Sequence, residues 1–550
     1  MAQAVATAVS PELHGVSTSS RPVEMADLEK NEMAEAASRE TEGAEIGDKK
    51  TADGSDDDMD AGDDADPKTV LPFSKLRCVA LVVTTASAGF LNIVSLQSAV
   101  IIMPTISRDL NIPASRQQWV LSSYTLAFGC FLLIWGRVAD LYGKRPVFIL
   151  GSAFVVGAAA NVPTAIGILG VTFPPGKAKN YAFSAYAAGA PLGGVFGNVL
   201  SGLVASYASW KWVFWVIAIL SAFITVAGIF VIPELPETRT AEELAELSLL
   251  HSVDWIGGAL ITGGLIALLF SMTEGNIVGW STAWVIVLIL LGLLMIAVFI
   301  AWELYQEKHT TRSPLIRLSL FRNRHFSAAV LIMCIFFGIF NDFSVYVTYL
   351  WQDYQGYSPI QTMLRFLPGA VTGTTVAIIV ARLISQVPTV LILVAGQLAT
   401  CVALILMAVP LPDSTSYFAY GFSAMVLAVV GADTAWPCLT LFMSKSLPPE
   451  HQAMGGALIN ASGQIGRAIG LAITTAIQLT VVAHERGVPV QDVGAVVKGD
   501  PASLRGIRVA NWFNLALGGC CVILCAVLFR GTGIVGKIPV QRQRQGGVSA

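Results

Sequence analysis

The sequence predicts an all-α polytopic membrane protein, in which two helical bundles flank an insert of two additional spans. Hydrophobic residues make up 54% of the 550 residues and charged residues only 13%, whereas about one quarter of a soluble globular protein is charged. Apolar stretches of membrane-spanning length recur along the chain, and charged residues gather between them. A soluble multidomain protein is therefore excluded.

Thirteen apolar segments are long enough, at about 1.5 Å per helical residue, to cross a hydrocarbon core of about 30 Å. They lie at about residues 76–103, 118–135, 146–170, 181–207, 213–232, 255–272, 284–302, 327–350, 362–384, 388–410, 416–437, 452–482 and 509–529.

Prolines and charges set the boundaries of the two bundles. We place the N-terminal bundle at 73–232, because Pro233 and Pro236 follow it. A linker at 233–326 carries the two inserted spans, and the C-terminal bundle occupies 327–530. Short loops rich in Lys and Arg stay inside, so 303–326 is predicted to be cytoplasmic, with Arg312, Arg317, Arg322 and Arg324.

Both ends of the chain are predicted to be cytoplasmic tails, at 1–72 and 531–550. Residues 1–68 hold 18 of the 37 acidic residues and 6 of the 34 basic ones. With so few large apolar side chains, this acidic segment cannot bury enough surface to fold. We expect it to be disordered, and the first span to act as its own insertion signal.

The sequence shows no enzymatic, cofactor or metal-binding motif, and we expect neither catalysis nor nucleic-acid binding. All eight cysteines fall in or beside apolar segments, where packing between helices explains them better than disulfides or metal ligation.

A charged loop between two apolar stretches, 136–145, carries the clearest functional signal. Its basic residues place it on the cytoplasmic side, and its glycines allow helix ends to approach closely. The loop consists of Gly136, Arg137, Val138, Ala139, Asp140, Leu141, Tyr142, Gly143, Lys144 and Arg145. It resembles the G-x-L-A-D-x-x-G-R-K loop of the major facilitator superfamily, which implies a transporter of that fold.

A second motif resembles the antiporter signature G-P-x-x-G-G of the fourteen-span drug:proton antiporters. It comprises Gly189, Pro191, Gly193 and Gly194, where proline bends the helix and glycines permit close helix contact. The likeness covers roughly residues 75–530 and is closest to fungal efflux transporters of the aminotriazole-resistance type. It implies two inserted spans and a protein that acts as a monomer. The expected partners are a small-molecule substrate, protons and the lipid bilayer.

Residues 146–170 depart from that pattern. In the family a third and a fourth span occupy this region, but these 25 residues reach only about 37 Å as one helix, enough for one crossing. One crossing would invert every later loop, including the basic one at 303–326. Either the segment forms a short re-entrant hairpin, or the sequence reflects an incorrectly joined gene, which we favour.

Ionisable residues inside apolar spans are expensive and suggest function. Asp342 and Asp433 are the proton-coupling candidates, and the alternative is that each only bonds a neighbouring helix. Arg467 is the main intramembrane cation, expected either to pair with a carboxylate or to snorkel to an interface. The acidic position of the family's first-span signature is Ser95, so that carboxylate is missing.

Uncharged polar and aromatic residues complete a mixed cavity that suits amphiphilic organic molecules. Its candidates are Asn92, Gln97, Tyr124, Phe340, Tyr346, Gln397, Trp436 and Gln464. We expect proton-driven efflux of small organic compounds or drugs at the plasma membrane, or alternatively the vacuolar membrane. The functional alternatives are uptake, inorganic-anion transport, or an inactive or receptor-like relative.

Asp140→Ala should reduce transport and leave membrane insertion intact, because Asp140 is expected to hold the cytoplasmic gate through a helix N-terminus and nearby basic groups. Transport assays at equal surface expression test this. Unchanged efflux would remove Asp140 from the gate.

Deleting residues 2–68 should leave the turnover of the purified carrier nearly unchanged, because a disordered tail makes no fixed contact with the bundle. The tail's abundance of Ser and Thr among carboxylates suits regulation by phosphorylation, so the amount of carrier at the membrane is expected to change instead. A large fall in turnover per reconstituted molecule would contradict the prediction of disorder.

Overall fold

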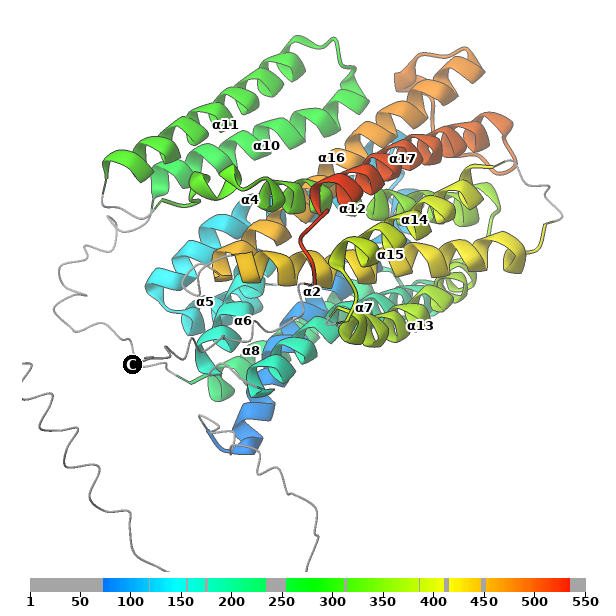
Figure 1. Ribbon diagram of the computed structural model, residues 1–550. Coiled ribbons are helices and arrows are strands. Elements are labelled where there is room, and N and C mark those ends of the chain that lie inside the picture. The colour runs from blue at the N-terminus through cyan, green and yellow to red at the C-terminus, as the bar shows by residue number, and fades with distance from the viewer. Residues whose placement is uncertain are drawn as a thin grey trace, which may run out of the picture. The chain divides into compact units, whose positions relative to one another are not determined.

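The computed structural model describes residues 73–534 except for 118, 155–156, 174–176, 234–253, 311–313, 385, 410–414 and 447–451. The acidic tail, the linker after Pro233 and the last 16 residues therefore lie outside the described residues. Within the described ranges the secondary structure is helical (Figure 1), which confirms the predicted all-α polytopic class.

Twelve helices of the described chain are long and apolar enough to cross a membrane. They are α2 (Lys75–Asp109), α4 (Trp119–Tyr142), α7 (Lys177–Tyr207), α8 (Lys211–Val231), α10 (Trp255–Val278), α11 (Ala283–His309), α12 (Arg324–Thr348), α13 (Pro359–Leu383), α14 (Thr389–Ala408), α15 (Tyr417–Ser446), α16 (Gln452–Arg486) and α17 (Pro501–Leu528). Short elements are α3 (Ala114–Gln117), η1 (Leu318–Arg322), the π-helical turn η2 (Tyr349–Tyr354) that continues α12, and η4 (Val490–Asp492).

Local sequence signals fix several helix starts. Ser358 caps α13 in a reciprocal capping box with Gln361, and Pro359 occupies the first turn. Asp500 accepts hydrogen bonds from the backbone of Ala502 and Ser503 at the start of α17. The guanidinium of Arg486 also donates to Asp500 and lowers the pKa of that carboxyl to about 2.

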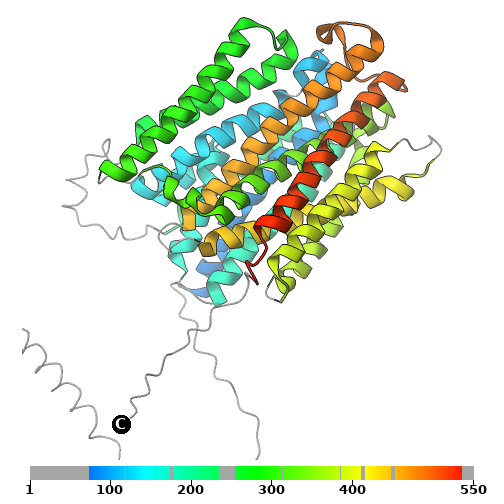
Figure 2. The same ribbon diagram turned by 45° about the horizontal axis from the view of Figure 1, so that its top comes forward.

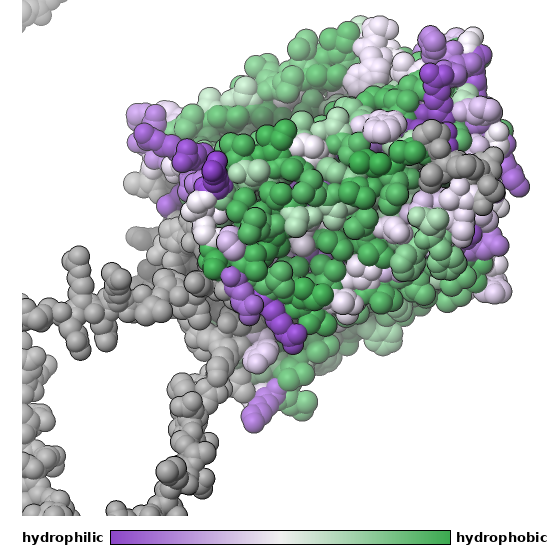
Figure 3. Space-filling model, turned by 45° about the vertical axis from the view of Figure 1, so that its right-hand side comes forward, coloured by the Kyte–Doolittle hydropathy of each residue, from purple (hydrophilic) through white to green (hydrophobic). Residues whose placement is uncertain are grey.

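The surface of the bundle carries an apolar belt. In the face shown in Figure 3, hydrophobic side chains fill the middle and hydrophilic side chains gather toward both ends. Large exposed apolar residues on α8 and α11 belong to such a surface, among them Trp215, Phe223 and Leu290. This distribution matches a chain surrounded by lipid rather than by water.

The helices form two bundles that contact each other along two seams. Helix α2 packs against α7 and α8 in the first bundle, and α12 packs against α16 and α17 in the second. Between the bundles, α4 lies along α16 and α7 lies along α13 (Figures 1 and 2). Both seams bring a helix from each half of the sequence into direct contact.

Residues 146–170, predicted as one of thirteen crossing segments, form a hairpin of two short helices instead. Helix α5 (Lys144–Ala153) has 10 residues and α6 (Ala158–Thr172) has 15, so at about 1.5 Å per residue neither crosses about 30 Å. The two run antiparallel. Ser152, at the end of α5, is bonded to Asn161 at 3.1 Å, whereas Lys144, at its start, packs beside Gly167 near the end of α6.

The hairpin returns the chain to the side on which it began. Every later helix therefore keeps the orientation that the basic loops require, with both the 136–145 loop and the 303–326 region on the predicted cytoplasmic side. The re-entrant alternative accounts for this geometry, and no inversion of the later spans is needed. Helix α11 also extends seven residues past the predicted boundary at 302, to His309.

The inserted pair α10–α11 packs over the α4–α16 seam (Figure 1). Thr262 on α10 donates to the carbonyl of Cys130 on α4 at 3.0 Å. Asn276, also on α10, donates to the carbonyl of Ala472 on α16 at 2.8 Å. The insert thus bonds to both bundles.

Gly157→Ala should destabilise the hairpin, because a Cβ at this position would overlap the backbone carbonyl of Gly151. Backbone cannot move aside as a flexible side chain can, and overpacking costs about 1–3 kcal/mol. Thermal unfolding of the purified protein measures the effect. Gly170→Ala on the same hairpin is the matched control, since its Cβ would meet no heavy atom within 4 Å. Equal melting temperatures for the two variants would contradict the hairpin.

Candidate functional site

Residues 136–145, predicted as a loop, are helical except for Gly143: residues 136–142 form the last turns of α4, and Lys144 and Arg145 begin α5. This charged segment lies where three helices meet. A Cβ on Gly136 would lie 3.6 Å from Pro163 of α6 and 3.9 Å from Ala457 of α16, so α4 passes close to both bundles here. Gly143 has a φ of +95°, which side chains rarely adopt, and this explains the glycine between α4 and α5. Arg145 donates to the carbonyl of Ile229 at the end of α8 at 2.9 Å.

Two charged residues of this loop are less fully defined. Arg137 is half-buried on the last turns of α4 and takes part in a polar interaction. The side chain of Asp140 lies outside the described residues, so the gate that we expect it to hold stays a prediction.

The predicted antiporter motif lies on α7 with its glycines facing α2. A Cβ on Gly189 would lie 3.1 Å from the carbonyl oxygen of Ala86, and one on Gly193 would crowd the backbone of Phe90. Gly194 and Gly197 make room for the side chain of Gln97. Small residues therefore allow α2 and α7 to touch through their backbones, as is common in membrane bundles.

Polar side chains from both bundles meet at the α4–α16 seam. Tyr124 on α4 donates a hydrogen bond to Oδ1 of Asn92 on α2 at 2.6 Å. The Tyr124 hydroxyl interacts electrostatically with Arg467 on α16. The guanidinium carbon of Arg467 lies 4.7 Å from the ring centroid of Phe337 on α12, and Trp436 on α15 packs edge-on against Phe337 at 5.4 Å.

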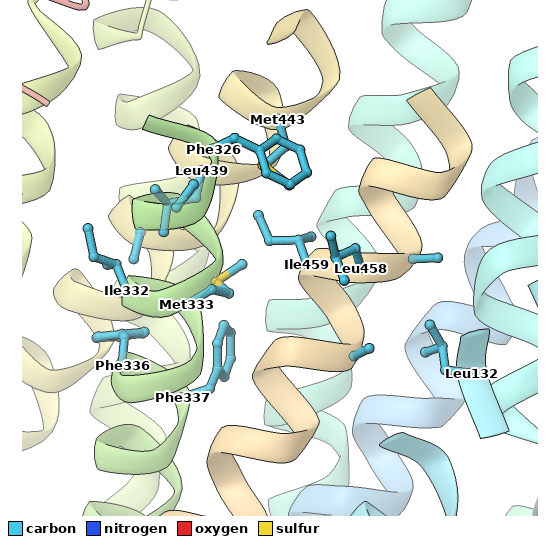
Figure 4. Close-up of a cluster of buried hydrophobic side chains, with 14 of the residues drawn as sticks. Leu132, Phe326, Ile332, Met333, Phe336, Phe337, Leu439, Met443, Leu458 and Ile459 are labelled. Carbon is cyan, nitrogen blue, oxygen red and sulfur yellow. The ribbon is translucent and has the colours of Figure 1, made fainter. Parts of the chain in front are cut away.

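Phe337 lies on the side of α12 that faces α16 (Figure 4). The contacts of Phe337 with Arg467 and with Trp436 therefore lie where α12, α15 and α16 meet. The sequence indicated four of these residues, Asn92, Tyr124, Arg467 and Trp436. It missed Phe337, because an apolar residue in an apolar span carries no signal of its own.

Asp342 is fully buried on α12. It lies five residues after Phe337, farther from the predicted cytoplasmic end of the helix. Its Oδ2 lies 2.6 Å from Oγ1 of Thr474 on α16. The same Thr474 hydroxyl lies 2.8 Å from the carbonyl oxygen of Gly470. Oδ1 of Asp342 makes no hydrogen bond of normal geometry among the described residues, and the side chain of Asn341 is a further donor close to this carboxyl.

Asp433 lies on α15 at the second seam. Its Oδ2 would meet a Cβ on Gly373 of α13 at 2.8 Å, and the same Cβ would lie 3.6 Å from Pro191. Oδ2 has no hydrogen-bond partner in the described part of the chain. The acid therefore lies where α15 packs on α13, close to Pro191 of the predicted antiporter motif on α7.

The other predicted cavity residues lie at different depths and on different helices. Gln464 is buried on α16 against Gly129 of α4, and its Oε1 has no partner among the described residues. Tyr346 is fully buried and packs with Met103 of α2. Phe340 stacks on Phe336. Gln397 is fully buried on α14, which packs between α15 and α17 inside the second bundle.

A pair of buried acids at the predicted cytoplasmic end of the insert was not predicted. Asp254 caps α10 and accepts from Trp302 at 3.0 Å. Glu303 on α11 is fully buried, interacts with Asp254, and accepts from the backbone N–H of Ile316 at 3.5 Å. The predicted helix boundary at 302 placed Glu303 in a loop, which hid its burial.

The sequence profile described as Major Facilitator Superfamily matches residues 85–156, 152–302 and 246–471, which together cover more than half of the chain. The low affinity ammonium transporter of Saccharomyces cerevisiae is 29% identical over 442 residues, 75% of this chain and 81% of its own length.

Two relatives from Aspergillus species carry names that refer to efflux or multidrug transport. The multidrug transporter mdr3 of Aspergillus fumigatus is 29% identical over 74% of this chain and 70% of its own length. Efflux pump terG of Aspergillus terreus is 25% identical over 83% of this chain and 87% of its own length.

Solved structures share the fold at low identity. The POT family transporter PepTSo has a TM-score of 0.58 at 14% identity, covering 84% of this chain and 98% of that one. The human organic anion transporter MFSD10 has a TM-score of 0.51 at 14% identity, covering 80% of this chain and 99% of that one. At such identity the likeness shows the fold alone.

Proposed function

Because the chain belongs to the Major Facilitator Superfamily, we propose that it is a carrier that exports small organic compounds in exchange for protons. Export is supported by the names of relatives such as terG and mdr3, and by the antiporter-type motif on α7. The proposed movement is a rocking of the two bundles about the α4–α16 and α7–α13 seams.

The single observation that carries proton coupling is the hydrogen bonding of Asp342. The Thr474 hydroxyl has one proton but lies within hydrogen-bond distance of two acceptors, Asp342 and the carbonyl of Gly470. A protonated Asp342 resolves this, because it donates to Thr474 while Thr474 donates to Gly470. The geometry suits an acid that holds a proton while it is buried.

Loss of that proton would change the local bonding of α16. An ionised Asp342 requires the Thr474 proton for itself, and the carbonyl of Gly470 then loses its hydroxyl partner. A buried carboxylate is also strongly disfavoured unless it gains further donors or water. We therefore propose that deprotonation accompanies opening of the α12–α16 contact.

Asp433 is the second proton-coupling candidate, because its buried Oδ2 lies beside Gly373 and the motif residue Pro191. Glu274 is the third acid to test. It accepts a hydrogen bond from Trp119 at 2.9 Å where α10 meets α4.

Uptake is the alternative direction of transport, and one relative is named an ammonium transporter. The buried cation Arg467 would repel ammonium in the α4–α16 seam, so we propose an organic compound rather than ammonium as the substrate. For the direction we keep export, which the names of terG and mdr3 support. We place the carrier in the plasma membrane as a monomer, with the vacuolar membrane as the alternative. A fluorescent fusion and the mass of the purified protein test these two assignments.

Asp342→Asn should abolish transport driven by a pH gradient and preserve substrate exchange, because the neutral amide mimics the protonated acid. Proteoliposomes with and without a gradient separate the two activities, and Asp433→Asn and Glu274→Gln are measured in parallel. Gradient-driven transport that survives in all three variants would reject carboxylate coupling at these positions. An unmodified protein that moves no compound in either direction would indicate the inactive or receptor-like alternative.

Thr474→Val tests the hydroxyl relay itself and should weaken gradient-driven transport at least several-fold. Thr480→Val is the matched control. Thr480 lies on the same helix and makes the same bond to the carbonyl four residues back, at 2.8 Å, but it is exposed and has no such acid beside it. Equal loss in both variants would mean that only helix stability is affected.

A further inference from the structure

Arg467 is a buried cation whose counter-charge the described chain does not supply. Only 9% of the residue is exposed, and its Nε has no hydrogen-bond partner in the ranges that the structure describes. No described acid forms an ion pair with it. Removing a charge from water costs several kcal/mol unless a partner compensates, so this position requires an explanation.

Snorkelling does not provide one. Arg467 lies about 15 residues from the first residue of α16 and about 19 from the last. The apolar span on this helix begins at Ala457, which is 10 residues or roughly 15 Å before Arg467, still farther than an arginine side chain extends. The guanidinium lies over Phe337 of α12 and interacts with the Tyr124 hydroxyl of α4, which places it inside the protein.

The described groups beside Arg467 are neutral. The Tyr124 hydroxyl gives its proton to Asn92 and can offer Arg467 only the lone pairs of its oxygen. Gln464, one turn earlier on α16, has an Oε1 without a partner among the described residues. The two candidate intramembrane acids have other neighbours: Asp342 bonds to Thr474, and Asp433 lies beside Gly373.

We propose that the transported compound is an amphiphilic organic monoanion whose negative group pairs with Arg467. This inference rests on the proposed function as a carrier and names its substrate class. The planar guanidinium presents paired donors that match a carboxylate. One cation matches one negative charge, because a second negative charge on the compound would remain unpaired in the seam.

The surroundings of Arg467 suit the rest of such a compound. Phe337 and Trp436 offer an aromatic surface beside the cation, which favours an apolar or aromatic body next to the acid group. The free Oε1 of Gln464 can accept a hydrogen bond from a hydroxyl or amide on the compound. An inorganic anion would leave this apolar surface unused.

The test measures binding of acid and amide pairs to the purified full-length protein. Salicylate and salicylamide, and benzoate and benzamide, have nearly the same shape and differ in charge, and octanoate adds an aliphatic acid. Affinity is measured by calorimetry without a pH gradient. We expect each aromatic acid to bind at least tenfold tighter than its amide.

Arg467→Gln should remove that preference. Arg467→Lys should retain part of it, because lysine keeps the positive charge but lacks the planar pair of N–H donors. Arg505→Gln is the matched control, since Arg505 is an arginine with 65% of its side chain exposed, and it should keep the full preference. The unliganded Arg467→Gln protein should melt at the same temperature as the unmodified protein or higher, because an uncompensated buried charge is lost.

Several results would overturn the proposal. These are equal binding of acids and amides by the unmodified protein, no binding of any of the three acids, or a preference that survives in Arg467→Gln. A lower melting temperature of Arg467→Gln with the preference intact would assign Arg467 a structural role. Because binding is measured without a gradient, loss of proton-driven transport alone would reject the proposed coupling and not the anion site.

Discussion

The close approach of α12 and α16 is the constraint on which the rest of the site depends. A Cβ on Gly466 would overlap the carbonyl of Cys334, and one on Gly470 would lie 2.9 Å from the Cα of Gly338. In lipid, helices associate through such packing rather than through the hydrophobic effect. The glycines bring Thr474 within hydrogen-bond distance of Asp342, and they bring Arg467 over Phe337.

Helix α16 also connects that contact to the first bundle. Its other side packs on α4, where Gly129 allows the side chain of Gln464 to approach, and on Gly136 at the start of the 136–145 segment. One helix therefore carries the cation, the hydroxyl partner of the acid, and one side of the seam. A change in the protonation of Asp342 can reach the α4 seam through a single rigid element, without a chain of intermediate side chains.

The sequence predicted the membrane class and the spanning helices because both depend on composition and length, which are local properties. It could not decide the structure of 146–170, since 25 largely apolar residues fit one crossing as well as two half-length helices. The turn depends on the contact of Gly157 with Gly151, which only the folded chain brings together.

The candidate site was predictable to a similar degree. Rare polar residues in apolar spans pointed to Asn92, Tyr124, Asp342 and Arg467, but sequence cannot say which of them face one another. The pairing of Tyr124 with Asn92 at 2.6 Å, and the lack of a described acid beside Arg467, both depend on helix rotation. Glu303 was missed for another reason, because the helix boundary was drawn before it.

The inserted pair limits how the two bundles can move. Helix α10 bonds to α4 through Thr262 and to α16 through Asn276, so it spans the same seam that must open if the bundles rock. At least one of these bonds must break or slide during such a movement. The Asn276 bond is made to a backbone carbonyl of α16, whose position shifts with that helix, whereas α4 and α10 also pack through Gly258 against Ile134. Gln491 also donates to the carbonyl of Val278 at the end of α10, so the insert is bonded on both sides of the seam. The insert is therefore expected to restrict the rocking of the two bundles until its bonds to one side are released.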